Sequence, residues 1–165
     1  MKNRIVLLLA ALVVFSGFTF GDSFAKNGML VAPGSLNATI GLGMHYSSGF
    51  GLGGGVEYSI GKFVIAEKLP FTYGIAGRAG LDLTSSVSLS AGAFGTLHFN
   101  WGALNFPSEL SWLGNFDSYL GLGITVFPRV DFDSIGGLSY YLSRNVAINL
   151  ESGLRASYLG VLFKL

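Results

Sequence analysis

Residues 35–46 read SLNATIGLGMHY, and large apolar side chains alternate along this stretch with small or polar ones. The larger side chains occupy the even-numbered positions, which are Leu36, Ala38, Ile40, Leu42, Met44 and Tyr46. Serine, asparagine, threonine, glycine and histidine occupy the odd-numbered positions. Because successive side chains of an extended strand point to opposite faces, this period of two predicts a strand with one apolar and one polar face.

The same alternation recurs along the rest of the chain, and no segment beyond residue 26 shows the period of an amphipathic helix. We predict eight strands, over Ser35–Tyr46, Leu52–Lys62, Phe71–Leu83, Val87–Trp101, Asp117–Phe127, Ile135–Leu142, Val146–Arg155 and Tyr158–Leu165. Several approach the roughly 9 to 11 residues that a tilted strand needs to cross a bilayer. All four prolines fall outside these predicted strands, as a closed sheet requires, because proline cannot donate to the hydrogen-bond ladder.

The charged residues of these strands share the polar face, with Lys62 at a strand end as the exception. A charge on a lipid-facing wall would cost roughly 2 to 4 kcal/mol at the middle of the bilayer. The pattern therefore predicts an all-β fold, an eight-stranded antiparallel up-and-down transmembrane β-barrel. We expect the inward charges to form a structural polar network in the lumen, made of Glu57, Arg78, Asp82, Asp117, Glu151, Arg155 and Lys164.

Two features of the predicted connections are less regular. The apolar phase flips between Leu154 and Leu159, which a two-residue hairpin at Ala156–Ser157 or a β-bulge would produce. The connection Gly102–Phe116 is long and rich in aromatic and aliphatic residues, so it fits a short interfacial helix or an aromatic belt.

The amino terminus has the pattern of an export signal. Lys2 and Arg4 precede an apolar run over Ile5–Phe15, and Ser23-Phe24-Ala25 places small residues where a signal peptidase cleaves. We therefore predict a signal peptide over residues 1–25 and a mature barrel domain over 26–165. A membrane-spanning helix is the alternative, although the uncharged stretch falls short of the usual ~20 residues.

Composition excludes several functional classes. The 165 residues are 12% charged with a net charge of +1, so the chain lacks the basic surface that nucleic acid requires. It has no cysteine and only two histidines, which excludes disulfides and ordinary structural zinc sites. We expect no metal site, no cofactor and no catalytic residues. The glycine-rich segments at 51–55 and 121–123 fit close strand approach in a narrow barrel better than a nucleotide loop.

One set of residues has the types of a nucleophilic triad. His45 and Ser47 are followed within one predicted hairpin by Glu57, which would supply a base, a nucleophile and an orienting acid. Turn chemistry at a strand end explains His45 and Ser47 equally well. His98 has no carboxylate nearby in the sequence, and its inward phase predicts a satisfied histidine of the lumen.

The export signal, the eight strands and a strand at the C-terminus together resemble the small outer-membrane β-barrels of the OmpA-domain, OmpX and opacity type. In such barrels the assembly machinery reads a last strand with alternate apolar residues and a terminal aromatic. Here the alternate positions are Leu159, Val161, Phe163 and Leu165, so leucine ends the chain where phenylalanine is usual. The segment 140–145, YYLSRN, also looks like the strand and tight turn before the penultimate strand of these proteins.

The resemblance implies a location in a bacterial outer membrane, contact with outer-membrane lipid and lipopolysaccharide, recognition by the assembly machinery, and a monomeric state. It also implies a structural, adhesive or envelope-interaction role with a side-chain-filled lumen and no enzymatic activity. Two alternatives remain open, a narrow channel for small solutes and a lipid A-modifying enzyme. The resemblance further implies that Gly102–Phe116 lies on the periplasmic side, where such barrels usually have short turns.

Overall fold

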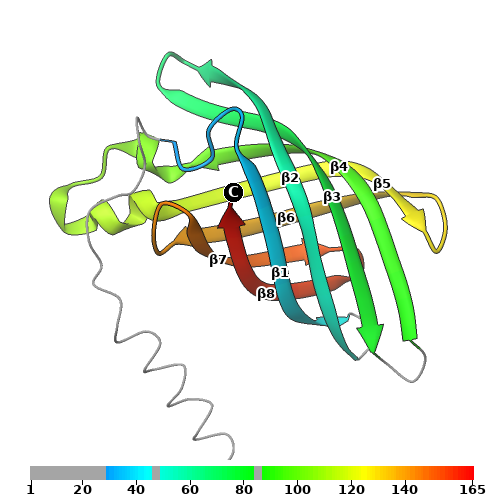
Figure 1. Ribbon diagram of the computed structural model, residues 1–165. Coiled ribbons are helices and arrows are strands. Elements are labelled where there is room, and N and C mark those ends of the chain that lie inside the picture. Colours follow the sequence, from blue (N-terminus) through cyan, green and yellow to red (C-terminus); the bar gives the residue numbers. More distant parts are fainter. Residues whose placement is uncertain (1–28, 46–48, 84–86) are drawn as a thin grey trace, which may run out of the picture.

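The computed structural model shows one closed antiparallel barrel in which each strand pairs with its neighbour in sequence and β8 pairs with β1 (Figure 1). It describes residues 29–45, 49–83 and 87–165, so the predicted signal peptide over residues 1–25 lies outside the described part. Within that part, no helix is long and apolar enough to cross a membrane. The predicted eight-stranded up-and-down barrel is confirmed.

The strands start and end within a few residues of the predicted ones. They are β1 (Leu36–His45), β2 (Phe50–Ile65), β3 (Leu69–Leu83), β4 (Val87–Asn100), β5 (Phe116–Phe127), β6 (Asp131–Tyr141), β7 (Val146–Gly153) and β8 (Ala156–Lys164). Both Met29 and Leu165 lie at one end of the barrel, which we call the terminal end. The other end is called the opposite end.

A β-bulge in β2 explains why Lys62 broke the charge pattern. The β2–β3 register shifts between Ser59 and Gly61, so Ile60 is the extra residue. Beyond it Lys62 lies opposite Thr72, whose side chain is buried on the inner face. The bulge reverses the phase of the last residues of β2, and Lys62 therefore shares the inward phase of the other charges.

The turn between β7 and β8 differs from the prediction. Gly153 pairs with Ala156, so the two turn residues are Leu154 and Arg155 rather than Ala156 and Ser157. Both have positive φ, 49° and 65°. A two-residue turn with this backbone conformation matches the right-handed twist of the two strands that it joins. Of the two expected causes of the phase flip, a two-residue hairpin or a β-bulge, the structure has the hairpin, two residues before the predicted position.

Two further details concern the terminal end. Pro70 was predicted to lie outside the strands, but it is the second residue of β3, opposite Val64 of β2. Pairing of β3 with β4 begins one residue later, at Phe71, so the other side of Pro70 has no strand next to it among the described residues. A missing N–H is tolerated at such an open edge. The connection from β4 to β5 contains two short 3-10 helices, η1 (Trp101–Leu104) and η2 (Ser108–Asn115).

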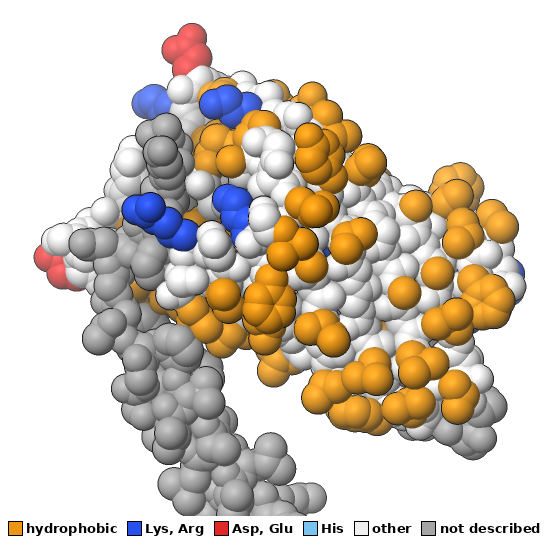
Figure 2. Space-filling model, viewed as in Figure 1, with side chains coloured by type: hydrophobic (Ala, Val, Ile, Leu, Met, Phe, Trp, Pro, Cys, Tyr) orange, Lys and Arg blue, Asp and Glu red, His pale blue; other side chains and the backbone are white. Residues whose placement is uncertain are grey.

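The outer wall is apolar and the inner wall is polar. Outward side chains in the middle of the strands are strongly exposed, for example Leu122 at 76% and Leu120 at 71%. Figure 2 shows hydrophobic side chains gathered over the visible part of the wall, with most charged groups of this face at the terminal end. In contrast, the buried residues include serine, threonine, asparagine and ionisable side chains from most of the strands.

Aromatic rings form a band on the outer wall near the terminal end. Phe71 stacks on Phe63 at 5.6 Å between ring centroids and contacts Phe99 at 5.2 Å. Farther round the barrel, Phe116 contacts Trp101 at 5.5 Å and Tyr140 at 4.8 Å. Rings at this level of a barrel wall are typical of a membrane–water interface.

Candidate functional site: the polar interior of the barrel

The centre of the interior is the guanidinium of Arg78 on β3. Its Nη2 lies 3.0 Å from Oε2 of Glu57 on β2, and its Nε lies 2.9 Å from Oε2 of Glu151 on β7. All three side chains are buried, and Arg78 also donates to the carbonyl oxygen of Val56 at 3.2 Å. Arginine suits this position because its donors are fixed in a plane and can bind two carboxylates at once.

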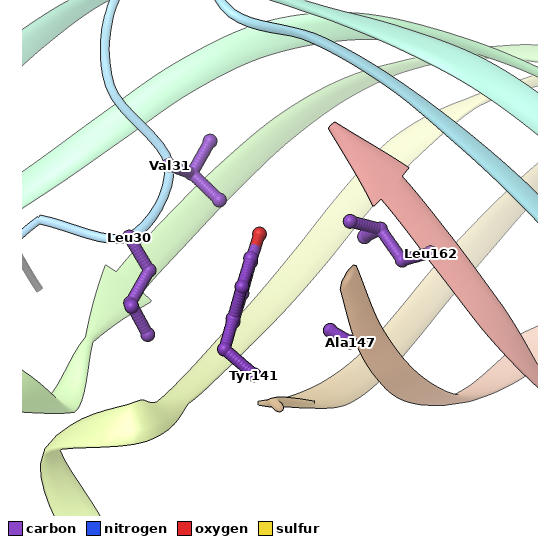
Figure 3. Close-up of a cluster of buried hydrophobic side chains, with 5 residues drawn as sticks. All are labelled: Leu30, Val31, Tyr141, Ala147 and Leu162. Carbon is purple, nitrogen blue, oxygen red and sulfur yellow. The ribbon is translucent and has the colours of Figure 1, made fainter. Parts of the chain in front are cut away.

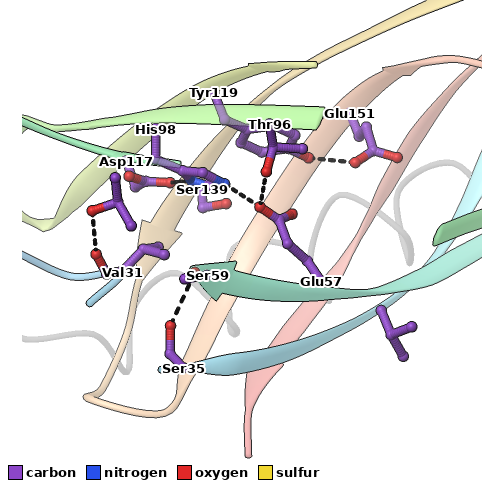
Figure 4. Close-up of polar contacts among 12 residues, drawn as sticks. Val31, Ser35, Glu57, Ser59, Thr96, His98, Asp117, Tyr119, Ser139 and Glu151 are labelled. Carbon is purple, nitrogen blue, oxygen red and sulfur yellow. Dashed lines mark hydrogen bonds and ion pairs between the residues drawn. The ribbon is translucent and has the colours of Figure 1, made fainter. Parts of the chain in front are cut away.

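His98 on β4 connects this cation site to a third carboxylate. Its Nε2 lies 2.5 Å from Oε1 of Glu57, and its Nδ1 lies 2.6 Å from Oδ2 of Asp117 on β5 (Figure 4). An imidazole ring can donate to two carboxylates only when both nitrogens carry hydrogen, so the arrangement fits an imidazolium ion. The ring also stacks on Tyr119 at 5.1 Å between centroids.

Neutral side chains extend the network to the rest of the wall. Thr96 donates to Oε1 of Glu57 at 2.6 Å, and Tyr119 donates to Oε2 of Glu151 at 2.6 Å. Ser139 on β6 donates to Oδ1 of Asn149 at 2.9 Å, and the Tyr119 hydroxyl lies 3.2 Å from the same oxygen. Together with the charged groups, these contacts connect the strands from β2 to β7 across the lumen.

Three predicted members of the network lie elsewhere. Asp82 lies near the far end of β3 and is half-buried, and Lys164 on β8 donates to the carbonyl oxygen of Leu30 at 3.0 Å at the terminal end. Arg155 was expected to point inward from a strand, but the structure places it in the β7–β8 turn, where it is exposed. The prediction extended the alternation of β7 two residues too far, and the tight turn redirects the chain there.

The chain before β1 closes the terminal end of the lumen. Residues 29–35, which we call the strap, fold into the mouth of the barrel, and Val31 is completely buried. Leu30 and Val31 pack there against Tyr141, Ala147 and Leu162 (Figure 3).

Side chains of the barrel wall hold the backbone of the strap. Oδ1 of Asn100 accepts the backbone N–H groups of Leu30 and Val31 at 2.5 and 2.9 Å. Thr72 donates to the carbonyl oxygen of Val31 at 2.8 Å. With the Lys164 bond to Leu30, these contacts satisfy four polar groups of a chain segment that would otherwise be buried without partners.

Tyr158 fills the lumen toward the opposite end. A Cβ atom at Gly53 would lie 2.6 Å from its ring, one at Gly43 would lie 2.7 Å away, and one at Gly80 would lie 2.6 Å from its hydroxyl. Glycines on β1, β2 and β3 therefore make room for a ring that crosses from β8. This contact explains part of the glycine run at 51–55, which is expected to allow close approach in a narrow barrel.

The space beside the ion network is small. A cavity beside Arg78, Asn149 and Glu151 measures about 10 Å³, which is room for about one water molecule. Within the described residues, no group of three histidine, aspartate or glutamate side chains could hold a metal ion. The arrangement can bind strands together by ion pairs and hydrogen bonds.

The proposed triad is not brought together. Glu57 lies opposite Asn37 on β1, eight residues from His45, which is about 26 Å along an extended strand. Ser47 lies outside the described residues, and only the backbone of His45 is described. The residues of the last strand, in contrast, lie as expected on the outer wall, with Leu159, Phe163 and Leu165 exposed and Val161 half-exposed.

Comparison with known proteins supports the fold and goes no further. No family model matches the chain, and no curated protein matches it. A solved structure described as "De novo design of transmembrane beta-barrels" is similar, with a TM-score of 0.54 and 17% sequence identity. The match covers 83% of this chain and 100% of the designed one. At this identity the likeness establishes a common barrel fold alone.

Proposed function

We propose that this protein is an integral β-barrel of a bacterial outer membrane, with a closed lumen and a structural or envelope-interaction role. The observation that carries the proposal is the reversal of polarity between the two faces of the wall. Leu120, Leu122 and Ile40 project from the outside in mid-strand, whereas Glu57, Arg78 and Glu151 are buried inside. A protein in water rarely exposes so continuous an apolar surface, and a lipid environment requires it.

Two further observations support this placement. The aromatic band that includes Phe71, Phe99 and Phe116 lies at one level of the wall, as interfacial rings do. Closure of the sheet between β1 and β8 leaves no strand edge in the wall itself, and hydrocarbon cannot satisfy an open edge. The match to a designed transmembrane barrel is consistent with both.

The remaining parts of the proposal follow from the location. An export signal over residues 1–25 would bring the chain to the envelope, and the outward residues of β8 would be read by the assembly machinery. Lipid and lipopolysaccharide would surround the wall of a monomer. The strap, the ion network and Tyr158 support a filled lumen and a role other than solute transport.

A charge substitution at an exposed position tests the membrane environment. In water, Leu122→Lys should be neutral because this side chain is already 76% exposed. In a bilayer we expect it to destabilise the folded barrel by about 2 to 4 kcal/mol, because it places a charge in hydrocarbon. The measurement is urea unfolding of the protein refolded into phospholipid vesicles.

Val87→Lys is the matched control, because Val87 is 71% exposed but begins β4 at the rim of the opposite end. We expect it to cost about 0 to 1 kcal/mol in the same vesicles. Equal and negligible effects of the two substitutions would contradict a lipid-facing wall.

A further inference from the structure

Hairpins at both ends extend beyond the closed wall. Among the described residues they leave three strand edges open: the end of β2 beyond Ser59, the start of β6 before Gly136, and the start of β4 (Val87–Ser90), which pairs with β3 alone. At the terminal end, pairing of β1 with β2 begins at Leu36 and Tyr58, and the backbone of Ser59 still bonds to Gly34 and Ser35. Beyond Ser59, β2 continues to Ile65 with β3 as the only strand that pairs with it in the described part of the chain. At the opposite end, β6 pairs with β5 from Asp131, but its pairing with β7 begins only at Gly136. Figure 1 shows these hairpins, β2–β3 and β5–β6, projecting from opposite ends of the barrel.

The chain protects the open edge of β6. Oδ1 of Asp131 accepts the backbone N–H of Phe132 at 3.0 Å, and Oδ1 of Asp133 accepts that of Ser134 at 2.8 Å. The two carboxylates occupy donors that a further strand would need, and they add negative charge to the edge. Such side chains are a known means of preventing edge-to-edge pairing.

The open edge of β2, residues Gly61–Ile65, has no such protection. The ladder to β3 is regular from Gly61 to Ile65, beyond the bulge at Ile60. No side chain of the described residues caps a backbone amide of this segment. Val64 and Ile65 are about half exposed, and the edge carries Lys62, with Lys68 across the turn. Neither lysine forms an ion pair within the described part of the chain.

The unpaired backbone of this edge defines what could bind there. Lipid is a poor occupant, because hydrocarbon satisfies neither N–H nor C=O groups. An extended peptide satisfies both at once, and its alternate side chains would lie along Val64 and the apolar outer face at Phe63. The hairpin tip carries two lysines, Lys62 and Lys68, and one acidic residue, Glu67, so its net charge is positive. This charge favours a peptide that carries a carboxylate.

We propose that the β2 edge (Gly61–Ile65) binds an extended, acidic segment of a partner protein by strand addition. This interaction goes beyond the structural role proposed above and places a protein-binding surface at the terminal end of the barrel. It assigns a use to an edge that the described residues leave uncapped, in contrast to the capped edge of β6.

The test uses a synthetic peptide of eight residues in which valine alternates with threonine and one threonine is replaced by aspartate. The protein is extracted from membranes in detergent, and amide hydrogen exchange is followed by mass spectrometry with and without the peptide. We expect the peptide to slow exchange in Gly61–Ile65 by about tenfold or more, because amides that enter a ladder are protected. Exchange in the capped edge, Asp131–Ser134, should not change.

Two matched controls separate strand addition from other binding. An N-methylated form of the same peptide keeps its side chains but cannot complete the ladder, so it should give no protection. In the variant Lys62→Glu/Lys68→Glu, the aspartate peptide should bind more weakly and a lysine-containing peptide more strongly. Retained gel mobility of the unboiled variant shows that it is folded.

Three results would overturn the proposal. Equal protection by the N-methylated peptide would show apolar adhesion without strand addition, and no protection at saturating peptide would show that the edge does not accept a strand. Slow exchange, in the peptide-free protein, of those amides of Gly61–Ile65 that point away from β3 would show that lipid, a second copy or another segment already covers the edge. None of these results depends on the Leu122→Lys measurement, so the two proposals fail separately.

Discussion

Replacement of Arg78 by methionine tests whether the interior network stabilises the barrel. Methionine keeps much of the side-chain length but removes the charge and every donor. Glu57 would retain its contacts with His98 and Thr96, whereas Glu151 would retain only the Tyr119 hydroxyl. The substitution therefore leaves at least one buried carboxylate without a charged partner.

We expect Arg78→Met to lower the free energy of unfolding by about 3 to 5 kcal/mol, the usual cost of breaking a buried ion pair from one side. Adding Glu151→Gln should recover a large part of this loss, because it removes the unpaired charge. The assay is urea unfolding in vesicles, followed by tryptophan fluorescence and by the mobility difference between folded and unfolded chains on a gel.

Arg129→Met is the control, because Arg129 forms an ion pair with Asp131 at 3.1 Å in which both side chains are more than half exposed. We expect it to cost no more than about 1 kcal/mol, as surface pairs do. If Arg78→Met costs no more than Arg129→Met, or if Glu151→Gln gives no recovery, the lumen is hydrated and the argument from buried charge is refuted.

Three other predictions follow from the interior. Gly53→Ala should destabilise the barrel by about 1 to 3 kcal/mol because its Cβ would meet the ring of Tyr158, whereas Gly77→Ala should be neutral because nothing lies within 4 Å; urea unfolding measures both. Asn100→Ala should release the strap by leaving two buried N–H groups unsatisfied, at a cost of about 1 to 3 kcal/mol. A cysteine at Val31 should therefore resist a water-soluble maleimide in the native background and react with it in Asn100→Ala; equal reaction in both would contradict the role of Asn100. In planar bilayers the purified protein should give no stable ionic current, and a steady conductance would contradict the filled lumen.

The fold could be predicted because a strand records its two faces at every second residue. The alternation over residues 35–46 fixed the outward and inward positions of β1, and the same argument held for the other strands. The errors occurred where the phase changes, at the bulge of Ile60 and at the turn of Leu154 and Arg155. One extra residue reverses every side chain that follows, and sequence alone does not distinguish a bulge from a turn at such a point.

The contacts of the interior could not be predicted in the same way. Alternation shows that His98 points inward, but it does not show that Glu57, 41 residues away, lies beside it. Arg78 and Glu151 are 73 residues apart and come from strands that are not neighbours. Their approach depends on the closure and stagger of the whole barrel. The strap was missed because Leu30 and Val31 belong to no alternating segment, and only their burial in the mouth of the barrel shows their role.

The division of the wall into two faces has a consequence for how this sequence changes over evolutionary time. Outward positions such as Leu120 and Leu122 need only be hydrophobic, so other aliphatic residues should replace them readily during evolution. Ancestry would then be recorded mainly in the inward polar residues and in the glycines beneath Tyr158, where partners restrict exchange. Distant relatives of such a barrel should be recognised by these few inward residues, even where their overall sequence identity is no higher than that of unrelated proteins.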